Sequence, residues 1–285
     1  MNLLRLAVQK SGRLHEGSVE LLRECGIEVS NSNGKLRALA ANFPLEVFFL
    51  RDDDIPQYVE DGVADVGIVG QNIVFEQEKK VLEAEPLDFG KCRLSIAVPK
   101  SHAYEGVSDL QGLRIATTYP NLLGRFLQKN GVSSDIHQIN GSVEIAPSIG
   151  LADAVCDLVS SGSTLISNGL REVEVIFRSE ATLISRQNLP EEQALLLEKL
   201  LFRIRAVKKS KRHKYILLNA PNDRIPAIVG ILPGMKSPTV LPLAESGWSS
   251  IHSVVQEDRF WEIIEDLKAN GAQGILVVPI EKMVV

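Results

Sequence analysis

The chain has 285 residues, of which 45% are hydrophobic and 24% charged, with a formal net charge of -5 and a pI near 5.7. Such a composition is typical of a globular protein with sizeable cores, and the length indicates two or three domains. The acidic balance excludes a general nucleic-acid surface, which needs clustered Lys and Arg, and no run approaches the ~20 apolar residues of a membrane span.

Short β-rich runs alternate with helical patterns in the first part of the chain. Strands are expected at Leu3–Gln9, Leu45–Leu50 and Asp65–Val69, each followed by a helix, at Glu16–Glu24, Ile55–Glu60 and Asn72–Glu78. This alternation predicts βαβ units on a largely parallel sheet.

A second α/β set begins near Cys92. It contains expected strands at Leu94–Val98, Leu113–Thr117 and Asp135–Ile139, and a helix at Asn121–Asn130. Two consecutive strands, Val173–Arg178 and Ala181–Arg186, and a helix at Glu191–Val207 then return the chain to the first set. We predict catalytic lobe I at 1–90 with 178–207, lobe II at 91–177, and a cleft between them. We see no internal sequence repeat.

The last segment, 208–285, has its own pattern. Its expected elements follow the order βαββαβ: strand Tyr215–Asn219, helix Arg224–Leu232, strands Thr239–Leu243 and Ser250–Val255, helix Arg259–Ala269 and strand Gly274–Pro279. Phe260, Ile263, Ile264 and Leu267 form one helix face, suited to covering a four-stranded antiparallel sheet. The pattern predicts a ferredoxin-like module. The basic run Lys208–Lys214 is interpreted as a solvated helix end or linker rather than a nucleic-acid patch.

Three widely spaced cysteines without a Cys-x-x-Cys pair favour neither a disulfide framework nor a zinc site. Five histidines lack the i, i+4 pairing of a zinc helix. The first residues have no long apolar core of an export signal. We therefore expect a cytoplasmic protein with no membrane or nucleic-acid partner.

The segment Asp153–Thr164 combines a strand-like start with a turn of small and hydroxyl residues that opens a helical stretch ending at Asn168–Gly169. A turn of this kind at a helix N-terminus presents unpaired N–H groups and hydroxyl donors to a phosphate. The same residues also suit an ordinary N-capped helix. On pattern alone the two interpretations are equally supported.

Two turns with charged side chains follow expected strands of the first lobe. In Gln9–Arg13, Gly12 stands near Lys10 and Arg13, which suits a pyrophosphate, although a loop with two exposed charges is the common case. In Arg51–Pro56, adjacent carboxylates either complement a helix dipole or help to place Mg2+ and a polyphosphate.

Taken in order, these segments resemble the successive motifs of the ATP phosphoribosyltransferase family. The motifs are Gln9–Arg13, Arg51–Pro56, Gly62–Gly70 with Gly67–Asn72, Asn140–Glu144, Leu151–Thr164 and Asn168–Val175. Leu232–Pro242 and Val278–Lys282 resemble the regulatory module of the long form of that family. The resemblance covers essentially the whole chain and implies an α/β fold, with a two-lobed, periplasmic-binding-protein-like catalytic unit and a C-terminal ferredoxin-like regulatory domain.

The resemblance also implies a reaction, the first step of histidine synthesis. N1 of the ATP adenine attacks C1 of phosphoribosyl pyrophosphate (PRPP), which releases pyrophosphate and forms phosphoribosyl-ATP. Such a reaction needs positioning and neutralisation of the departing charge, with Mg2+ as cofactor, and no covalent nucleophile.

The resemblance assigns roles to particular residues. The PRPP set is Asp153, Ala154, Asp157, Ser160, Ser161, Gly162, Ser163 and Thr164, in which the last five hold the 5-phosphate and the two aspartates bind ribose hydroxyls or the metal. The ATP and pyrophosphate set is Lys10, Ser11, Gly12, Arg13, Arg51, Asn72 and Tyr119. The catalytic set is Lys10, Arg13, Arg51, Glu144 and Asp157. Asn72 receives no proton-transfer role, because an amide does not titrate.

For the C-terminal module the resemblance implies histidine as an inhibitor, with Asn219 and Thr239 as contacts, although either residue suits a turn equally well. It further implies AMP or related nucleotides as ligands, and dimers that assemble into hexamers. Two alternatives remain at this point. One is a prephenate-dehydratase-like enzyme, whose dicarboxylate substrate needs no phosphate cradle. The other is a cytoplasmic two-lobed small-molecule sensor or binding protein.

Overall fold

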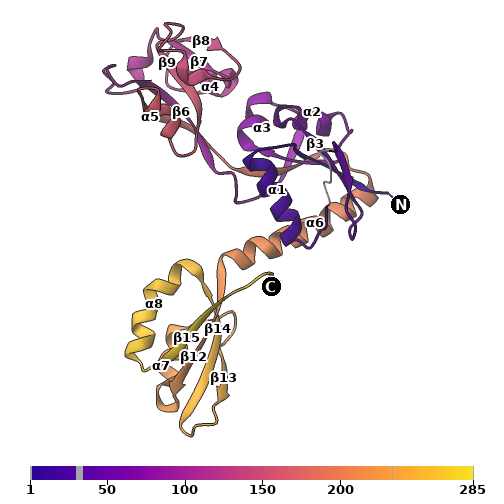
Figure 1. The fold of residues 1–285 in the computed structure, drawn as a ribbon, viewed down its shortest axis with the longest axis vertical. Coiled ribbons are helices and arrows are strands. Elements are labelled where there is room, and N and C mark those ends of the chain that lie inside the picture. Colours follow the sequence, from indigo (N-terminus) through magenta and orange to yellow (C-terminus); the bar gives the residue numbers. More distant parts are fainter. Residues whose placement is uncertain (1, 30–34, 233, 285) are drawn as a thin grey trace. The chain divides into compact units, whose positions relative to one another are not determined.

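The computed structural model describes residues 2–29, 35–232 and 234–284 (Figure 1). Contacts within the chain divide it into two compact units, Met1–Leu197 and Glu198–Val285. Pro233, within the predicted regulatory motif Leu232–Pro242, lies outside the described residues.

The first unit contains two sheets, and the first sheet has the strand order β2-β3-β1-β4-β11-β5. Its strands are β1 (Leu4–Gln9), β2 (Arg37–Leu39), β3 (Leu45–Leu50), β4 (Val66–Gly70), β5 (Val81–Pro86) and β11 (Ala181–Arg186). Helices α1 (Arg13–Glu24), α2 (Ile55–Glu60) and α3 (Gln71–Gln77) follow β1, β3 and β4, which pair in parallel. We call this sheet with its three helices the first lobe. The carboxyl ends of its parallel strands meet at one edge, where ligands of open α/β sheets bind.

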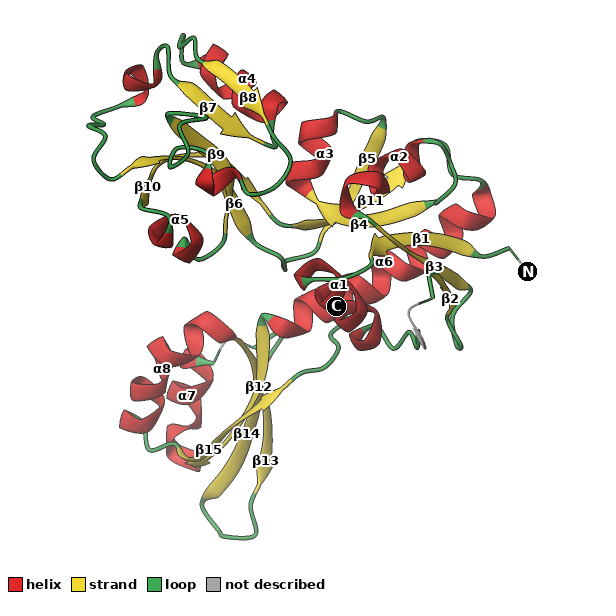
Figure 2. Cartoon of the chain, turned by 45° about the horizontal axis from the view of Figure 1, so that its top comes forward, coloured by secondary structure: helices red, strands yellow, loops and turns green. Residues whose placement is uncertain are grey.

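The second sheet has the order β10-β6-β9-β7-β8. Its elements are β6 (Cys92–Pro99), β7 (Arg114–Thr117), β8 (Asp135–Gln138), β9 (Ala154–Val159) and β10 (Leu170–Ser179), with helices α4 (Pro120–Lys129) and α5 (Ser163–Ser167). We call this set the second lobe. Strands β7, β8 and β9 are parallel, so their carboxyl ends also share an edge. Strand β10 continues almost directly into β11 of the first sheet, as Figure 2 also shows, so the predicted crossing strands are present.

A four-residue pattern, Gly-x-Ala-Asp, occurs once in each lobe, contrary to our expectation of no repeat. Asp65 accepts hydrogen bonds from the backbone N–H, Nε and Nη2 of Arg5, whose Nη2 also donates to the carbonyl of Gly62. Asp153 accepts the same three bonds from Arg114, whose Nη1 donates to the carbonyl of Gly150. We call these two arrangements the arginine clamps. Each clamp joins the start of a strand to its parallel neighbour, β1 to β4 and β7 to β9.

The second unit contains a four-stranded antiparallel sheet of order β13-β14-β12-β15. Its elements are the C-terminal half of α6 (Glu191–Lys211), β12 (His213–Pro221), α7 (Ile225–Ile231), β13 (Thr239–Pro242), β14 (Trp248–Gln256), α8 (Glu257–Ala269) and β15 (Gln273–Pro279). The order βαββαβ confirms the predicted ferredoxin-like module. Both α7 and α8 lie on one face of the sheet (Figure 2). That face is apolar because Ile216 and Ile251 are buried at alternate positions of β12 and β14, and they form a core with Ile228 of α7 and with residues of α8.

Candidate functional site

Two charged turns, the cationic turn Gln9–Arg13 and the mainly acidic turn Arg51–Pro56, lie side by side at the carboxyl edge of the first sheet. The N–H of Lys10 donates to the carbonyl of Leu50 at 2.8 Å, which ties the end of β1 to the end of β3, next to Arg51. Gly12 has φ 87°, a left-handed conformation that favours glycine, and it directly precedes α1. The turn therefore exposes Lys10, Ser11 and Arg13 toward solvent at this edge.

The hydroxyl turn after β9 lies at the carboxyl edge of the second sheet. Gly162 has φ 82° and is the residue before α5, which has only five residues, Ser163–Ser167. Ser161 Oγ and Ser163 Oγ are 3.0 Å apart, and the side chains of Ser160, Ser161, Ser163 and Thr164 are exposed. The turn therefore gathers hydroxyls at an open surface, and a helix this short contributes little dipole of its own.

One hydrogen bond joins the cationic turn of the first lobe to this hydroxyl turn. Arg13 Nη1 donates to Ser160 Oγ at 3.1 Å, although the two residues are 147 positions apart in the chain. Arg93 on β6, which sequence reasoning missed, donates from Nη1 to the carbonyl of Ser160 at 3.3 Å and forms an ion pair with Glu172. No local sequence motif marks Arg93, because it comes to lie beside β9 through the pairing of β6 with β9, which joins distant parts of the chain.

A cavity of about 740 Å³ lies where the carboxyl edges of both lobes meet. The first lobe contributes Arg51, Asp52, Asp53, Ile73, Glu76 and Gln77, and the second lobe contributes Thr118, Tyr119, Pro120, Asn121, Gln138, Asn140 and Gly141. The volume suits a nucleotide-sized ligand. The structure therefore places Arg51 and Tyr119, both in the predicted nucleotide set, around one cavity. The turn Ser160–Thr164 is outside the lining of this cavity.

Carboxylates concentrate around the cavity. Burial raises the pKa of Asp53, and its neighbours Asp52 and Asp54 raise it further. Burial also raises the pKa of Asp157, the N–H of Leu158 lowers it, and the charge of Glu144 raises it again. Burial is the main cause of the raised pKa of Tyr119, and the charges of Asp157, Asp53 and Asp52 contribute. Asp52 and Asp53 belong to the first lobe and Asp157 to the second, and all three raise the pKa of the Tyr119 phenol. Negative charge from both lobes therefore lies beside the cavity.

Asn72 and Tyr119 have internal partners. Asn72 is 5% exposed, its Nδ2 donates to Tyr119 Oη at 3.1 Å, and its Oδ1 accepts from Ser179 Oγ at 2.9 Å. Tyr119 is 8% exposed but still lines the cavity. The Asn72 amide therefore joins the lobes, and of this pair Tyr119 is the one with access to a ligand.

Glu76 forms a second connection between the lobes, which the sequence did not reveal. Its Oε1 and Oε2 accept the N–H groups of Asn121 and Leu122, each at 2.9 Å, and its own carbonyl accepts Asn121 Nδ2. A carboxylate of α3 thus caps the N-terminus of α4, where the helix dipole favours negative charge. We call these contacts the Glu76 cap. It closes one wall of the cavity.

Asp153 and Ala154 are not brought to the hydroxyl turn. They lie at the start of β9, six strand residues before Ser160, and Ala154 is fully buried. Four residues of extended chain separate the Cα atoms of Asp153 and Asp157 by about 13 Å, so the two carboxylates cannot share one metal ion. The Arg114 clamp lowers the pKa of Asp153 to about 2. Its partners match those of Asp65, which supports a structural role.

Asp153→Asn is expected to lower the free energy of unfolding by only about 1 kcal/mol, because water partly screens the ion pair with Arg114. It should leave kcat within about twofold. The pKa in the folded state lies below the ordinary 3.8, so this stabilisation is present above pH 4 and is lost as pH falls toward 2. Urea denaturation at pH 3 and pH 7 measures it. The matched variant Asp65→Asn, whose side chain is fully buried, should lose about 3 kcal/mol. A hundredfold loss of kcat in Asp153→Asn would instead show that this carboxylate contacts substrate.

Metal-binding capacity rests on the cavity carboxylates. Within residues 2–29, 35–232 and 234–284, no group of three or more His, Cys, Asp or Glu side chains forms a ready-made metal site. Mg2+ commonly takes one or two protein carboxylates and fills its remaining positions with substrate phosphates and water. Asp52 and Asp53, which line the cavity beside Arg51, fit that pattern.

The two predicted effector contacts lie on the sheet face opposite α7 and α8. Asn219 pairs with Ser250, and Thr239 pairs with His252, two residues further along β14. His252 bridges Tyr215 Oη and Ser250 Oγ on the same face. The structure therefore places Asn219 and Thr239 on one face, diagonally across β14, without direct contact.

Comparison with known proteins places this geometry in a family. The family model described as ATP phosphoribosyltransferase matches residues 51–206, and the model of its C-terminal domain matches residues 210–282. The ATP phosphoribosyltransferases of Cytophaga hutchinsonii and Phocaeicola vulgatus are 60% and 57% identical over 282 residues, which cover 99% of this chain and 99% and 100% of those proteins.

Solved structures agree. The ATP phosphoribosyl transferase (HisG:HisZ) complex from Thermotoga maritima contains a chain with TM-score 0.60 and 28% identity, covering 71% of this chain and 99% of that one. A histidine kinase sensor domain similar to periplasmic binding proteins has TM-score 0.51 at 14% identity, covering 73% of this chain and 91% of that one, which confirms the two-lobed fold alone. This chain belongs to the ATP phosphoribosyltransferase family.

Proposed function

We propose that this chain joins N1 of the ATP adenine to C1 of PRPP, releasing pyrophosphate, as the first step of histidine synthesis. The observation that supports this best is the Arg13–Ser160 hydrogen bond, which joins a cationic turn and a hydroxyl turn beside a nucleotide-sized cavity. The family match over both parts of the chain supports it independently and leaves the sensor and prephenate-dehydratase alternatives without support.

The turns divide the substrates between them. Ser160, Ser161, Gly162, Ser163 and Thr164 bind the ribose 5-phosphate through N–H groups and hydroxyls. Lys10, Arg13 and Arg51 neutralise the pyrophosphate as it leaves, with Ser11 and Gly12 allowing close approach. ATP occupies the cavity beside Tyr119.

The carboxylates complete the site. Asp157 lies on the second lobe near the end of β9, where it orients the ribose hydroxyls, and Glu144 sits close enough to influence its pKa. Asp52 and Asp53 would hold Mg2+, which supplies charge neutralisation for the phosphates. Because ribosyl C1 becomes positively charged as pyrophosphate leaves, the negative potential of Asp157 favours that state.

The activity test is direct. The purified chain is incubated with ATP, PRPP and Mg2+ together with a pyrophosphatase, and the ultraviolet absorbance of phosphoribosyl-ATP is followed. A product that depends on PRPP supports the proposal. Its absence from a folded preparation would refute it.

We propose that histidine inhibits the enzyme through the uncovered sheet face of the C-terminal unit, with Asn219 and Thr239 as contacts. Inhibition at a remote site requires different affinities in two states. Thr239→Val, which keeps the side-chain size but removes the hydroxyl, should raise the histidine concentration for half inhibition about tenfold with kcat unchanged. Unchanged inhibition would exclude Thr239 as a contact.

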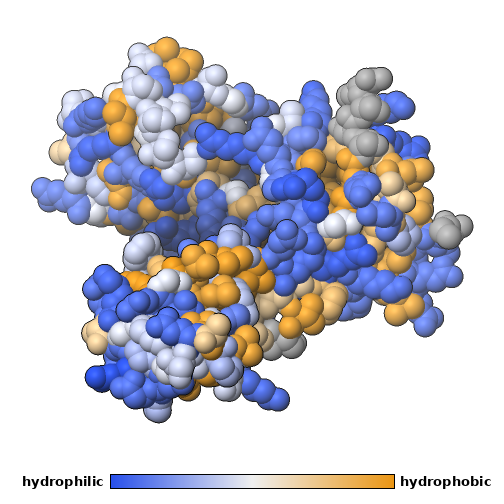
Figure 3. Space-filling model, turned by 60° about the horizontal axis from the view of Figure 1, so that its bottom comes forward, coloured by the Kyte–Doolittle hydropathy of each residue, from blue (hydrophilic) through white to orange (hydrophobic). Residues whose placement is uncertain are grey.

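We propose further that the protein is a cytoplasmic homo-oligomer, from dimer to hexamer, and that AMP or related nucleotides also bind. The uncovered face carries exposed apolar side chains, among them Leu241 at 48%, Leu276 at 60% and Val278 at 43% exposure. The space-filling view shows apolar patches, in orange, within a mainly hydrophilic surface (Figure 3). Such patches commonly mark interfaces. No helix of the described residues is long and apolar enough to cross a membrane.

The functional division of the chain that we propose is lobe I at 1–90 with 178–207, lobe II at 91–177 and the regulatory domain at 208–285. The last boundary lies inside α6, a continuous helix from Glu191 to Lys211. The family models support a change near this point, since one ends at residue 206 and the next begins at 210.

A further inference from the structure

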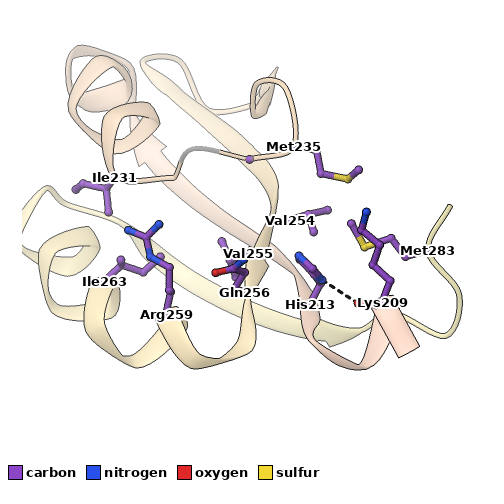
Figure 4. Close-up of a pocket in the computed structure, with 11 residues that line it drawn as sticks. Lys209, His213, Ile231, Met235, Val254, Val255, Gln256, Arg259, Ile263 and Met283 are labelled. Carbon is purple, nitrogen blue, oxygen red and sulfur yellow. Dashed lines mark hydrogen bonds between the residues drawn. The ribbon is translucent and has the colours of Figure 1, made fainter. Parts of the chain in front are cut away.

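A second cavity, of about 320 Å³, lies entirely within the C-terminal unit (Figure 4). It is found where β12 begins and β14 ends, and the neighbouring parts of α7 and α8 also line it. Two residues of the basic run Lys208–Lys214, Lys209 and His213, line it. The proposed function assigns no role to this run. Its volume is at the lower end of the range of about 300–1,000 Å³ for small-molecule sites.

Three basic side chains, Lys209, His213 and Arg259, and the amide of Gln256 line this cavity. Lys209 and His213 are four residues apart, and His213 Nδ1 is 2.8 Å from the carbonyl of Lys209, as the dashed line in Figure 4 shows. Because a carbonyl only accepts, Nδ1 carries the hydrogen and Nε2 remains available to a ligand. Among the described residues, neither Lys209 nor Arg259 forms an ion pair.

None of the described residues that line the cavity is acidic. Four carboxylates come near in sequence, Glu257, Asp258, Glu262 and Glu281, and among the described residues none of them forms an ion pair with Lys209 or Arg259. Glu257 forms an ion pair with Lys214 at 2.7 Å, and Asp258 Oδ1 accepts the backbone N–H of Arg259 at 3.0 Å. The positive charge of Lys209 and Arg259 is therefore left for a ligand.

Apart from Gln256, the rest of the wall is apolar. Ile231, Val255 and Ile263 belong to the module's core or pack against it, and Met235 and Met283 contribute flexible thioether side chains that adapt to a ligand's shape. Ser253, which is 5% exposed, lies under Gly234 of the lining, and its Oγ has no hydrogen-bond partner in the part of the chain that the structure describes. The cavity thus combines cations at its rim with an apolar interior and a spare hydroxyl beside it.

We propose that this cavity binds a small carboxylate with an aromatic or branched apolar body. Lys209 and Arg259 bind the carboxylate, and the body contacts Ile231, Ile263 and the two methionines. The site is distinct from the proposed histidine contacts, because Asn219 and Thr239 lie on the uncovered face of the sheet whereas Ile231 and Ile263 belong to helices on the covered face.

The experiment uses the full chain labelled with ¹³C at the methionine methyl groups. The chain has three methionines, and two of them, Met235 and Met283, line the cavity, so Met1 is an internal reference. Phenylacetate is titrated while the methyl signals are recorded, and phenylacetamide and acetate are titrated in parallel. Lys209→Gln and Arg259→Gln remove one charge each from exposed positions. Arg224→Gln, an exposed arginine of the same module outside the cavity, is the matched control.

Phenylacetate is expected to shift the Met235 and Met283 signals saturably and to leave Met1 unchanged. Each charge variant should weaken binding about fivefold, the double variant about twentyfold, and Arg224→Gln not at all. Phenylacetamide and acetate should bind much more weakly. Equal binding of phenylacetamide, unchanged affinity in the double variant, or no saturable shift at millimolar phenylacetate would each overturn the proposal. The measurement requires no catalysis, so it stands apart from the transferase assay.

Discussion

Asp157→Asn is expected to lower kcat about a hundredfold and, at the same time, to raise the free energy of unfolding at pH 7. The loss of rate follows from removing negative charge beside the reacting ribosyl carbon. The gain in stability follows from burial, which raises the pKa of this carboxyl and is reinforced by Glu144. A group that binds its proton more tightly in the folded chain makes the fold less stable as pH rises through its titration. Asparagine removes that cost.

Urea denaturation from pH 3.5 to pH 8, together with initial rates, measures both effects. The wild type should lose stability relative to Asp157→Asn as pH rises above 3.8, the ordinary pKa of an aspartate. Asp135→Asn, an exposed carboxylate on β8, is the control and should change neither quantity. Lower stability together with full activity would assign Asp157 to the framework of the second lobe.

Arg13→Ala is expected to reduce kcat/KM by about 10²- to 10³-fold, the usual cost of one charge-stabilising donor, with a stability change below about 0.5 kcal/mol. The side chain is exposed, and its hydrogen bond to Ser160 is the contact that joins the two turns. Arg13→Lys should recover part of the rate, since it restores the charge without the two-pronged geometry.

Arg23→Ala controls for an arginine lost from the same helix, because Arg23, in the last turn of α1, forms a local ion pair with Glu20 of that helix. Rates and thermal unfolding of the three variants separate the outcomes. If Arg13→Ala and Arg23→Ala lost activity equally, or if Arg13→Ala unfolded at a much lower temperature, Arg13 would have no special role at the phosphates.

The sequence predicted most of the fold because hydrophobic periodicity is a local signal. Strands β3 and β11 and helix α2 have the expected bounds. Strands β2 and β5 were missed. Both lie at the edges of the sheet and bury few side chains, so burial imposes little alternation of apolar and polar residues on them, and β5 also contains two glutamates. Helix α1 begins at Arg13, three residues earlier than predicted, because Gly12 turns the chain directly into the helix.

The site was predicted only in part, for a related reason. Its turns have local signatures, and the structure brings Arg13 to Ser160 and Arg51 to Tyr119. The partners of Asp153 and Glu76 lie 39 and about 45 residues away, and no periodic pattern reports such contacts. The Gly-x-Ala-Asp repeat has only four residues, too few to stand out in the sequence, and it is the two arginine clamps in the structure that reveal it.

The Glu76 cap has a consequence for solvent exchange. The N–H groups of Asn121 and Leu122 are held by a carboxylate of the other lobe, and neither has a carbonyl acceptor within its own helix turn. Exchange with deuterium requires both hydrogen bonds to Glu76 to break, and separation of α3 from α4 breaks them together. Their exchange rates in heavy water therefore measure how often, and at what free-energy cost, the lobes separate, and a substrate that closes the lobes should slow both amides together.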